Sequence, residues 1–297
     1  MHKIYTVLIL LALISLSADA QIRPSKKKGG TPVAGKNRRQ DEFLQKQWWI
    51  GLKGGINFTQ ASPQQRYTVL TGTGGYPTSQ LDKAYDNFNK SGSQASLEIT
   101  FYYKGFSFSF QPGYRHSRFT YSNQFEWTDN EDVNNHLVLN YKQENLVDYV
   151  DLPLLVKYDL TRTKLRPYVQ LGVFYSLLTT ASKSVIVEGT DFASGGSNQF
   201  TNQPVIVGAR DLYHKGYWGV LGGVGADYNL GNVRLVLDIR YQAGISNITN
   251  TSNRFSNDRL SGIGDALDDM KLNNIVISGG VLFPLRFLGT GFKTLDR

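Results

Sequence analysis

The histidines are the first residues to consider for catalysis or metal binding. Besides His2, the chain has His116, His136 and His214 in three separate regions, without the spacing of a metal site. His116 precedes Ser117, a pair that could serve an acyl hydrolase or acyltransferase at a membrane rim. A catalytic triad is defined by geometry, however, and the sequence has no Gly-x-Ser-x-Gly elbow. The simpler interpretation is that all three are ordinary loop or rim residues.

Other candidate sites are also weak. Asp265, Asp268 and Asp269 could bind a divalent cation, but their spacing is not that of an EF-hand loop. The glycine-rich run at 72–75 lacks the Gly-Lys-Ser/Thr of a phosphate-binding loop. The chain has no cysteine, which excludes disulfides and thiolate metal sites. We therefore expect no catalytic residue, no bound metal and no cofactor.

Ten charged residues share the polar faces of segments whose other face is apolar. In a membrane barrel they must point inward, because an outward-facing Arg or Lys costs about 2–4 kcal/mol at mid-depth. An eight-stranded interior is just wide enough to be filled by side chains, so we expect a paired ionic plug. A proton relay is the alternative use of such a set. The residues are Lys53, Glu98, Asp151, Lys157, Arg166, Asp227, Arg234, Asp238, Arg240 and Arg286.

The segments that carry these charges alternate with period 2, which indicates β-strands. The clearest example is the hairpin at 149–178, in which Leu152, Leu154 and Val156 oppose Asp151 and Lys157. The expected strands are 48–58, 94–104, 105–119, 149–160, 164–178, 216–228, 232–246 and 273–287.

The connections between these strands alternate in length. Short turns are expected at 104–105, 161–163 and 230–231, and long polar segments at 59–93, 120–145, 182–215 and 247–272. This pattern predicts an all-β fold, an eight-stranded antiparallel up-and-down transmembrane β-barrel with short periplasmic turns and long extracellular loops. The 120–145 segment contains alternating apolar residues and is expected to form a hairpin above the membrane, turning near Asp129 and Asn130.

Aromatic residues are expected to form a girdle at each membrane interface, where an amphipathic ring is favoured. A soluble ligand-binding barrel, the alternative fold, would place its apolar face inward. The lower girdle would hold Trp48, Trp49, Phe101, Tyr103, Phe106, Tyr158, Tyr168, Tyr228, Phe283 and Phe287. The upper girdle would hold Phe58, Tyr114, Phe119, Tyr175, Tyr217, Trp218 and Tyr241.

The chain termini complete the predicted domain organisation. Residues 1–20 have the layout of a secretory signal, with cleavage expected between Ala20 and Gln21. Residues 21–46 are basic and form a flexible periplasmic segment, 47–288 the barrel and 289–297 a C-terminal tail. The formal charge of +8 is concentrated in the basic segment and does not point to nucleic acid.

Three stretches resemble the PorT-like outer-membrane β-barrel family of Bacteroidota: 48–59 (WWIGLKGGINFT), 149–160 (YVDLPLLVKYDL) and 166–178 (RPYVQLGVFYSLL). The resemblance runs from about 47 to 288. It implies location in the cell outer membrane and, for some members, a link to type IX protein secretion and gliding. The last strand departs from the pattern, since it contains Pro284 and is followed by ten residues after Phe287.

We therefore expect a non-enzymatic outer-membrane protein that acts in envelope interactions, as an accessory of type IX protein secretion. Its expected partners are outer-membrane lipid and periplasmic or secretion-system proteins. The alternatives are a small channel or passive transporter and a membrane-embedded lipid-modifying enzyme.

Overall fold

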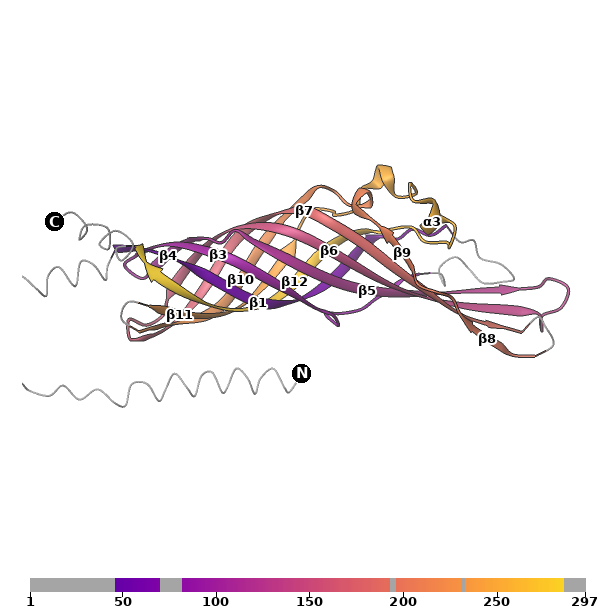
Figure 1. The fold of residues 1–297 in the computed structure, drawn as a ribbon, viewed down its shortest axis with the longest axis horizontal. Coiled ribbons are helices and arrows are strands. Elements are labelled where there is room, and N and C mark those ends of the chain that lie inside the picture. Colours follow the sequence, from indigo (N-terminus) through magenta and orange to yellow (C-terminus); the bar gives the residue numbers. More distant parts are fainter. Residues whose placement is uncertain (1–45, 70–81, 193–195, 231–232, 286–297) are drawn as a thin grey trace, which may run out of the picture. The chain divides into compact units, whose positions relative to one another are not determined.

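The computed structural model describes residues 46–69, 82–192, 196–230 and 233–285, which belong to a compact unit from Phe43 to Arg297 (Figure 1). The predicted signal, its cleavage site at Ala20 and Gln21, the basic segment up to residue 45, Arg286, Phe287 and the C-terminal tail lie outside the described residues. Within the described ranges, no helix has both the length and the apolar composition needed to cross a membrane.

The described residues fold mainly into antiparallel strands. The connecting segments contain two 3-10 helices, η3 (Arg210–Leu212) and η4 (Thr251–Asn253), and one short helix, α3 (Asp258–Ser261). The strands are β1 (Lys46–Gln65), β2 (Ala84–Tyr85), β3 (Ser91–Tyr103), β4 (Phe106–Phe110), β5 (Gly113–Thr128), β6 (His136–Asp159), β7 (Leu165–Asp191), β8 (Asn198–Thr201), β9 (Val205–Gly208), β10 (Gly216–Asn229), β11 (Arg234–Gly244) and β12 (Asp269–Pro284).

The strand pairings close into a ring. Going round it, β1 pairs with β12, then β11, β10, β7 and β6 follow. Next come β4 and β5, which together occupy one position in the wall, because each of them pairs with β6 on one side and with β3 on the other. The ring is completed by the pairing of β3 with β1. The ring therefore has eight wall positions, which confirms the predicted all-β antiparallel barrel.

The outer surface of the ring carries a band of exposed apolar side chains. On the outer face of the wall, Leu52 is 71% exposed, Leu171 70% and Leu237 60%. The inward-facing residues beside them include Lys53, Gln170 and Asp238, which are polar or charged. Because a soluble protein rarely leaves so much contiguous apolar surface in water, this band is the lipid-facing surface of a transmembrane barrel.

Three strands run well beyond that band. A membrane-spanning strand needs about 9–11 residues, whereas β6 has 24 and β7 has 27. In Figure 1, β5, β6 and β7 continue past the barrel as a narrow sheet, to which β8 and β9 add. The predicted hairpin above the membrane is present: β5 and β6 pair up to Thr128 and His136, and Asp129 N–H donates to Asn135 O at 2.9 Å.

The prediction of a loop throughout 182–215 is wrong. β7 continues to Asp191, and β8 and β9 lie within the same segment. The cause is a β-bulge: Asp148 pairs with Thr180 but Tyr149 with Leu178, which leaves Thr179 as an extra residue. Because one extra residue reverses the side-chain alternation, the period-2 pattern of the lower part of β7 stops at Leu178.

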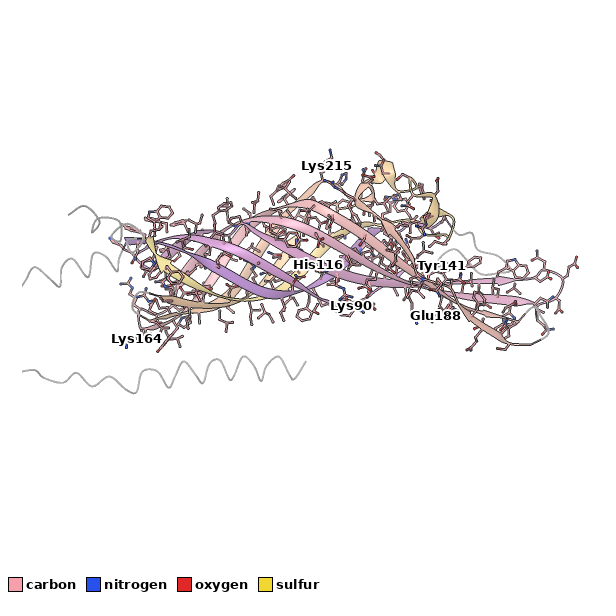
Figure 2. The ribbon with its side chains drawn as sticks, viewed as in Figure 1. Lys90, His116, Tyr141, Lys164, Glu188 and Lys215 are labelled. Atoms are coloured by element: carbon pink, nitrogen blue, oxygen red, sulfur yellow. The ribbon has the colours of Figure 1, made fainter. Side chains whose placement is uncertain are left out.

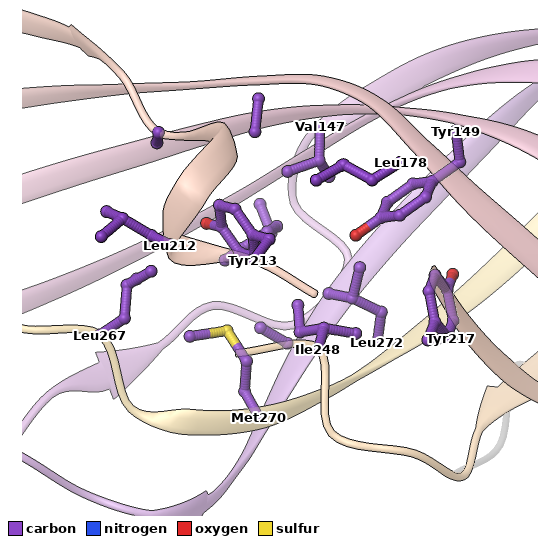
Figure 3. Packing of buried hydrophobic residues seen from close by; sticks show 14 of the residues in the cluster. Val147, Tyr149, Leu178, Leu212, Tyr213, Tyr217, Ile248, Leu267, Met270 and Leu272 are labelled. Carbon is purple, nitrogen blue, oxygen red and sulfur yellow. The ribbon is translucent and has the colours of Figure 1, made fainter. Parts of the chain in front are cut away.

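Above the bulge the polarity of the wall is reversed. Val185 and Val187 now point inward and are buried, while Ser184 and Glu188 point outward. The inward residues join a hydrophobic core with Ile248, Leu260, Leu267 and Met270 from the connection between β11 and β12 and the start of β12 (Figure 3). We call the segment 247–269 the cap, because it packs on the interior of the upper barrel.

Four aromatic residues of the predicted girdles point into the barrel instead. They are Trp49, Phe119, Tyr168 and Tyr217, all with side chains at most 6% exposed. The reason is alternation: Tyr168 lies between Arg166 and Gln170 on the inner face of β7, and Trp49 follows the outward-facing Trp48. Trp48, Tyr103, Phe106, Tyr158 and Trp218 do lie on the outer face.

Candidate functional site

The centre of the lower lumen is a fully buried ionic cluster. Lys53 on β1 pairs with Asp238 on β11 and lies 3.4 Å from Glu98 on β3, measured from Nζ to Oε2. Lys157 on β6 donates to Glu98 Oε1 at 2.5 Å, and Thr100 donates to the same oxygen at 2.8 Å. Four strands that are distant in sequence are thus joined across the barrel interior.

Two further pairs lie at the turn end of the lumen. Arg234 Nη1 is 3.2 Å from Asp227 Oδ2, and Arg166 Nη1 is 3.6 Å from Asp159 Oδ2. The guanidinium of Arg234 also stacks on the ring of Trp49, 4.1 Å from its centroid. This cation–π contact explains why an aromatic residue points inward here.

A third pair lies where the lumen meets the hydrophobic core. Arg115 on β5 donates to both carboxylate oxygens of Asp151 on β6, at 2.7 and 3.1 Å. It also donates to the hydroxyl of Tyr217 at 2.7 Å and lies over the ring of Tyr149. Ser176 donates to Asp151 at 2.6 Å. This bidentate pair has the geometry typical of strong arginine–carboxylate contacts.

The structure therefore brings together most of the charged residues predicted for the lumen. Nine of the ten lie in the described residues, and all nine are at most 9% exposed. Arg240 differs from the others because it donates to Gln111 Oε1, at 2.9 Å, rather than to a carboxylate.

Sequence reasoning missed two members of this network, Arg115 and Asp159. Asp159 follows Lys157 on the inner face of β6, so the alternation that found Lys157 could have found it. Arg115 has the same alternation as Ser107, Ser109 and Gln111, which places it on the polar face too, although it was not included among the predicted lumenal charges.

The three aspartates considered for a cation site each have a basic partner instead. Asp265 pairs with Lys183, Asp268 with Lys83 at 3.0 Å, and Asp269 with Arg254. No group of three or more metal-ligating side chains occurs in the part of the chain that the structure describes. Burial lowers the pKa of Lys183 to about 8, against the opposing effect of Asp265. The Lys183 pair fastens the cap to β7 and the Lys83 pair fastens it to the residues before β2, whereas the Arg254–Asp269 pair lies within the cap.

His116 lies on the outer wall just above the apolar band. Its Nδ1 is 2.6 Å from Asp148 Oδ1, and Thr180 donates to Asp148 Oδ2 at 2.5 Å. Burial raises the pKa of Asp148, but the hydrogen bonds from Thr180 and His116 outweigh it and leave that pKa below its ordinary value. Ser117 points into the barrel, so His116 and Ser117 do not form a hydrolase pair.

The two other histidines have separate surroundings. His136 stacks on Phe192, with 4.1 Å between the ring centroids. The backbone N–H of His214 donates to Ile248 O at 2.7 Å. Neither histidine shares a site with His116, whose position on the outer wall is marked in Figure 2.

Several solved outer-membrane barrels are similar in fold at low sequence identity. Neisserial surface protein A is 15% identical, with a TM-score of 0.30, over 80% of this chain and 96% of that one. The outer membrane protein W of E. coli is 12% identical, with a TM-score of 0.35, over 81% and 98%. Ail of Yersinia pestis is 12% identical, with a TM-score of 0.27, over 80% and 99%.

Family membership follows from the sequence match. No curated protein matches the chain. The model of the outer membrane protein beta-barrel domain matches residues 33–250, which include every wall strand except β12. Together with the closed ring and its apolar outer band, this match shows that the chain belongs to the family of the outer membrane protein beta-barrel domain.

Proposed function

We propose that this protein is a non-enzymatic outer-membrane barrel that binds protein partners in the envelope, as an accessory of protein secretion. The observation that supports this proposal is the sheet of β5, β6 and β7 beyond the membrane-spanning band. Long loops of outer-membrane barrels lie on the extracellular side, so this sheet would project from the cell surface. Exposed apolar residues on it, Val133 and Ile206, are 77% and 63% exposed and offer contact points.

The filled lumen supports a binding role over that of a channel. Lys53, Glu98 and Asp238 cross the lower lumen, and the cap packs on the upper interior. Under the proposal, the reconstituted protein gives no large, stable ohmic conductance in planar bilayers. Such a conductance would favour a channel.

The arrangement of polar groups on the outer wall supports a non-enzymatic role. Asp148 already accepts hydrogen bonds from His116 and Thr180, and the neighbouring Arg118 and Glu144 pair with each other at 2.5 Å. These groups neutralise one another across adjacent strands, as in a structural network. The resemblance of three strands to PorT-like proteins supports a partner from a secretion system.

Site-specific photo-crosslinking in native envelopes tests the binding role. A photoreactive residue at Val133 or Ile206 on the projecting sheet should give protein adducts on irradiation, whose identity reveals the partner. The matched control is Leu171, which is 70% exposed on the lipid-facing band and should give lipid adducts. A photoreactive residue at Leu160, 58% exposed beside the short turn, samples the opposite end.

The proposal is overturned if neither Val133 nor Ile206 gives a protein adduct. Adducts only at Leu160 would place the partner in the periplasm instead. If adducts form at the projecting sheet but contain no secretion component, the binding role stands and the secretion role is wrong.

A further inference from the structure

The described residues of the lower lumen include one more buried cation than buried carboxylates. Among the described residues there, the buried cations are Lys53, Arg115, Lys157, Arg166, Arg234 and Arg240, and the buried carboxylates are Glu98, Asp151, Asp159, Asp227 and Asp238. Every cation except Arg240 forms an ion pair with at least one of these carboxylates. Arg240 is only 3% exposed. An unpaired charge inside a barrel surrounded by lipid is costly.

Neutral polar side chains surround this arginine on the barrel's inner face. Gly223 faces Arg240 across β10 and β11 and pairs with Gln170 on its other side. Because Gly223 between them has no side chain, the side chains of Gln170 and Arg240 are direct neighbours on the inner face of the barrel. Gln242 follows Arg240 on the inner face of β11 and pairs in register with Asn274. Gln170, Gln242 and Asn274 are at most 1% exposed.

Several polar atoms of this group lack a hydrogen-bond partner in the part of the chain that the structure describes. They are Nε of Arg240, both amide atoms of Gln170, both amide atoms of Gln242 and Nδ2 of Asn274. Buried polar groups in folded proteins are nearly always satisfied. Exchanging the nitrogen and oxygen positions of either glutamine amide does not change the number of unsatisfied donors and acceptors, because both atoms of each amide lack partners. Unsatisfied donor groups therefore outnumber acceptors here.

We propose that Arg240, with Gln170, Gln242 and Asn274, binds a small monovalent anion such as chloride inside the barrel. One negative charge would balance the surplus of the lumen, and an anion that only accepts hydrogen bonds would satisfy the excess of N–H donors. A multivalent anion would leave a net negative charge. The site is independent of the partner binding proposed above, and its occupant would act as a fixed part of the plug.

Crystallography of the full chain in bromide tests the proposal directly. Protein purified and crystallised with bromide in place of chloride should show an anomalous peak in contact with the guanidinium of Arg240. The Arg240→Met variant should lose that peak. If the wild-type density at Arg240 shows water only, or if the variant keeps the peak, the anion site is wrong.

A matched control separates a local site from a general effect of lumenal charge. Arg234→Gln also removes one positive charge, but at the turn end beside Asp227, and should keep the bromide peak at Arg240. Loss of the peak in both variants would overturn a local site. If Arg240→Met does not fold, the wild-type protein decides: its unfolding temperature should rise when chloride replaces gluconate at equal ionic strength, and an unchanged temperature would count against the site.

Discussion

At the scale of single residues, buried charges occur in two different surroundings. In the lower lumen, Lys53 and Glu98 belong to a polar layer inside a lipid-covered wall. In the upper barrel, Lys183 and Asp265 pair within a hydrophobic core that also holds Tyr121. Removing one member of such a pair leaves the other buried and uncompensated, which typically costs about 3–5 kcal/mol.

The Lys183 pair predicts how the stability of the cap depends on pH. Burial lowers the pKa of Lys183 from 10.5 to about 8 when the cap is in place. Between these two values the open state binds more protons than the closed state, so closure becomes more favourable as pH rises. Each unit of pKa difference is worth about 1.4 kcal/mol. Cleavage of segment 247–269 by subtilisin should therefore slow, relative to a reference variant, between pH 8 and 10.

The reference variant is Lys183→Met with Asp265→Leu, which replaces the ion pair by apolar side chains of similar size. Such replacements of buried pairs are often neutral or stabilising, so this cap should close normally. Its protection should not change with pH in the same window, apart from the protease's own response. Equal pH dependence in the two proteins would show that Lys183 does not titrate as the structure indicates.

Alternation alone was enough to predict the residues of the lower lumen but not those of the cap. Lys53, Asp238 and Lys157 each lie on the polar face of a recognisable strand. Lys183 lies beyond the bulge, and its partner Asp265 is 82 positions away in an irregular segment. A contact of that kind depends on how the cap folds back, for which no local pattern exists. The alternation rule could also have predicted that Tyr168 and Trp49 point inward.

At the scale of elements, the bulge in β7 determines where the apolar side chains of the wall switch from the outer face to the inner face. Below Thr179, apolar residues such as Leu171 and Val173 face lipid; above it, apolar residues such as Val185 face the core. β6 has no extra residue of its own, but its polarity changes at the same level, between Val150 and Asp148. The change marks the height at which the wall leaves the apolar band.

Deleting Thr179 tests this role of the bulge. Without the extra residue, the alternation above it would shift by one, turning Val185 outward and Glu188 inward. We expect the lower barrel to form, because its pairings are unaffected, while the upper sheet and cap become sensitive to protease. Thr179→Ala keeps the extra residue and should resemble the wild type. Full resistance of the deletion variant would mean that β7 can adopt another register at little cost.

The strands below the bulge were predictable, and the extensions above it were predictable only in part. The hairpin of β5 and β6 was foreseen because it has its own apolar residues and a turn signal near Asp129. The upper part of β7 was not, since the bulge interrupts its alternation. The short strands β8 and β9 exist only because β7 provides an edge with which to pair.

At the scale of the whole molecule, the barrel is closed by the two ends of the described chain. β1 and β12 pair from Trp49 and Pro284 up to Gln65 and Asp269. Pro284 ends the strand, so its missing N–H does not interrupt this seam. Contacts between such distant segments form slowly, because loop closure must precede them. The lumenal cluster crosses the same seam through the pair of Lys53 and Asp238.

Because closure and the lumenal cluster lie below the projecting sheet, the sheet should be dispensable for folding. Replacing residues 124–140 by Asn-Gly would join Asn123 to Tyr141, which pair in register, through a two-residue hairpin turn. This shortened protein should still show heat-modifiable migration in gels from the membrane fraction. Loss of heat-modifiable migration would show that the sheet is needed for barrel assembly.

The neighbouring residues Trp48 and Trp49 have a practical consequence for spectroscopy. Trp48 is 50% exposed on the outer face, whereas Trp49 is stacked on Arg234 inside. One peptide bond thus separates an indole accessible to quenchers dissolved in the bilayer from an indole shielded from them. Insertion into vesicles and completion of the interior can be followed as separate fluorescence signals, each from a variant in which Trp48 or Trp49 is the only one of the four tryptophans that remains.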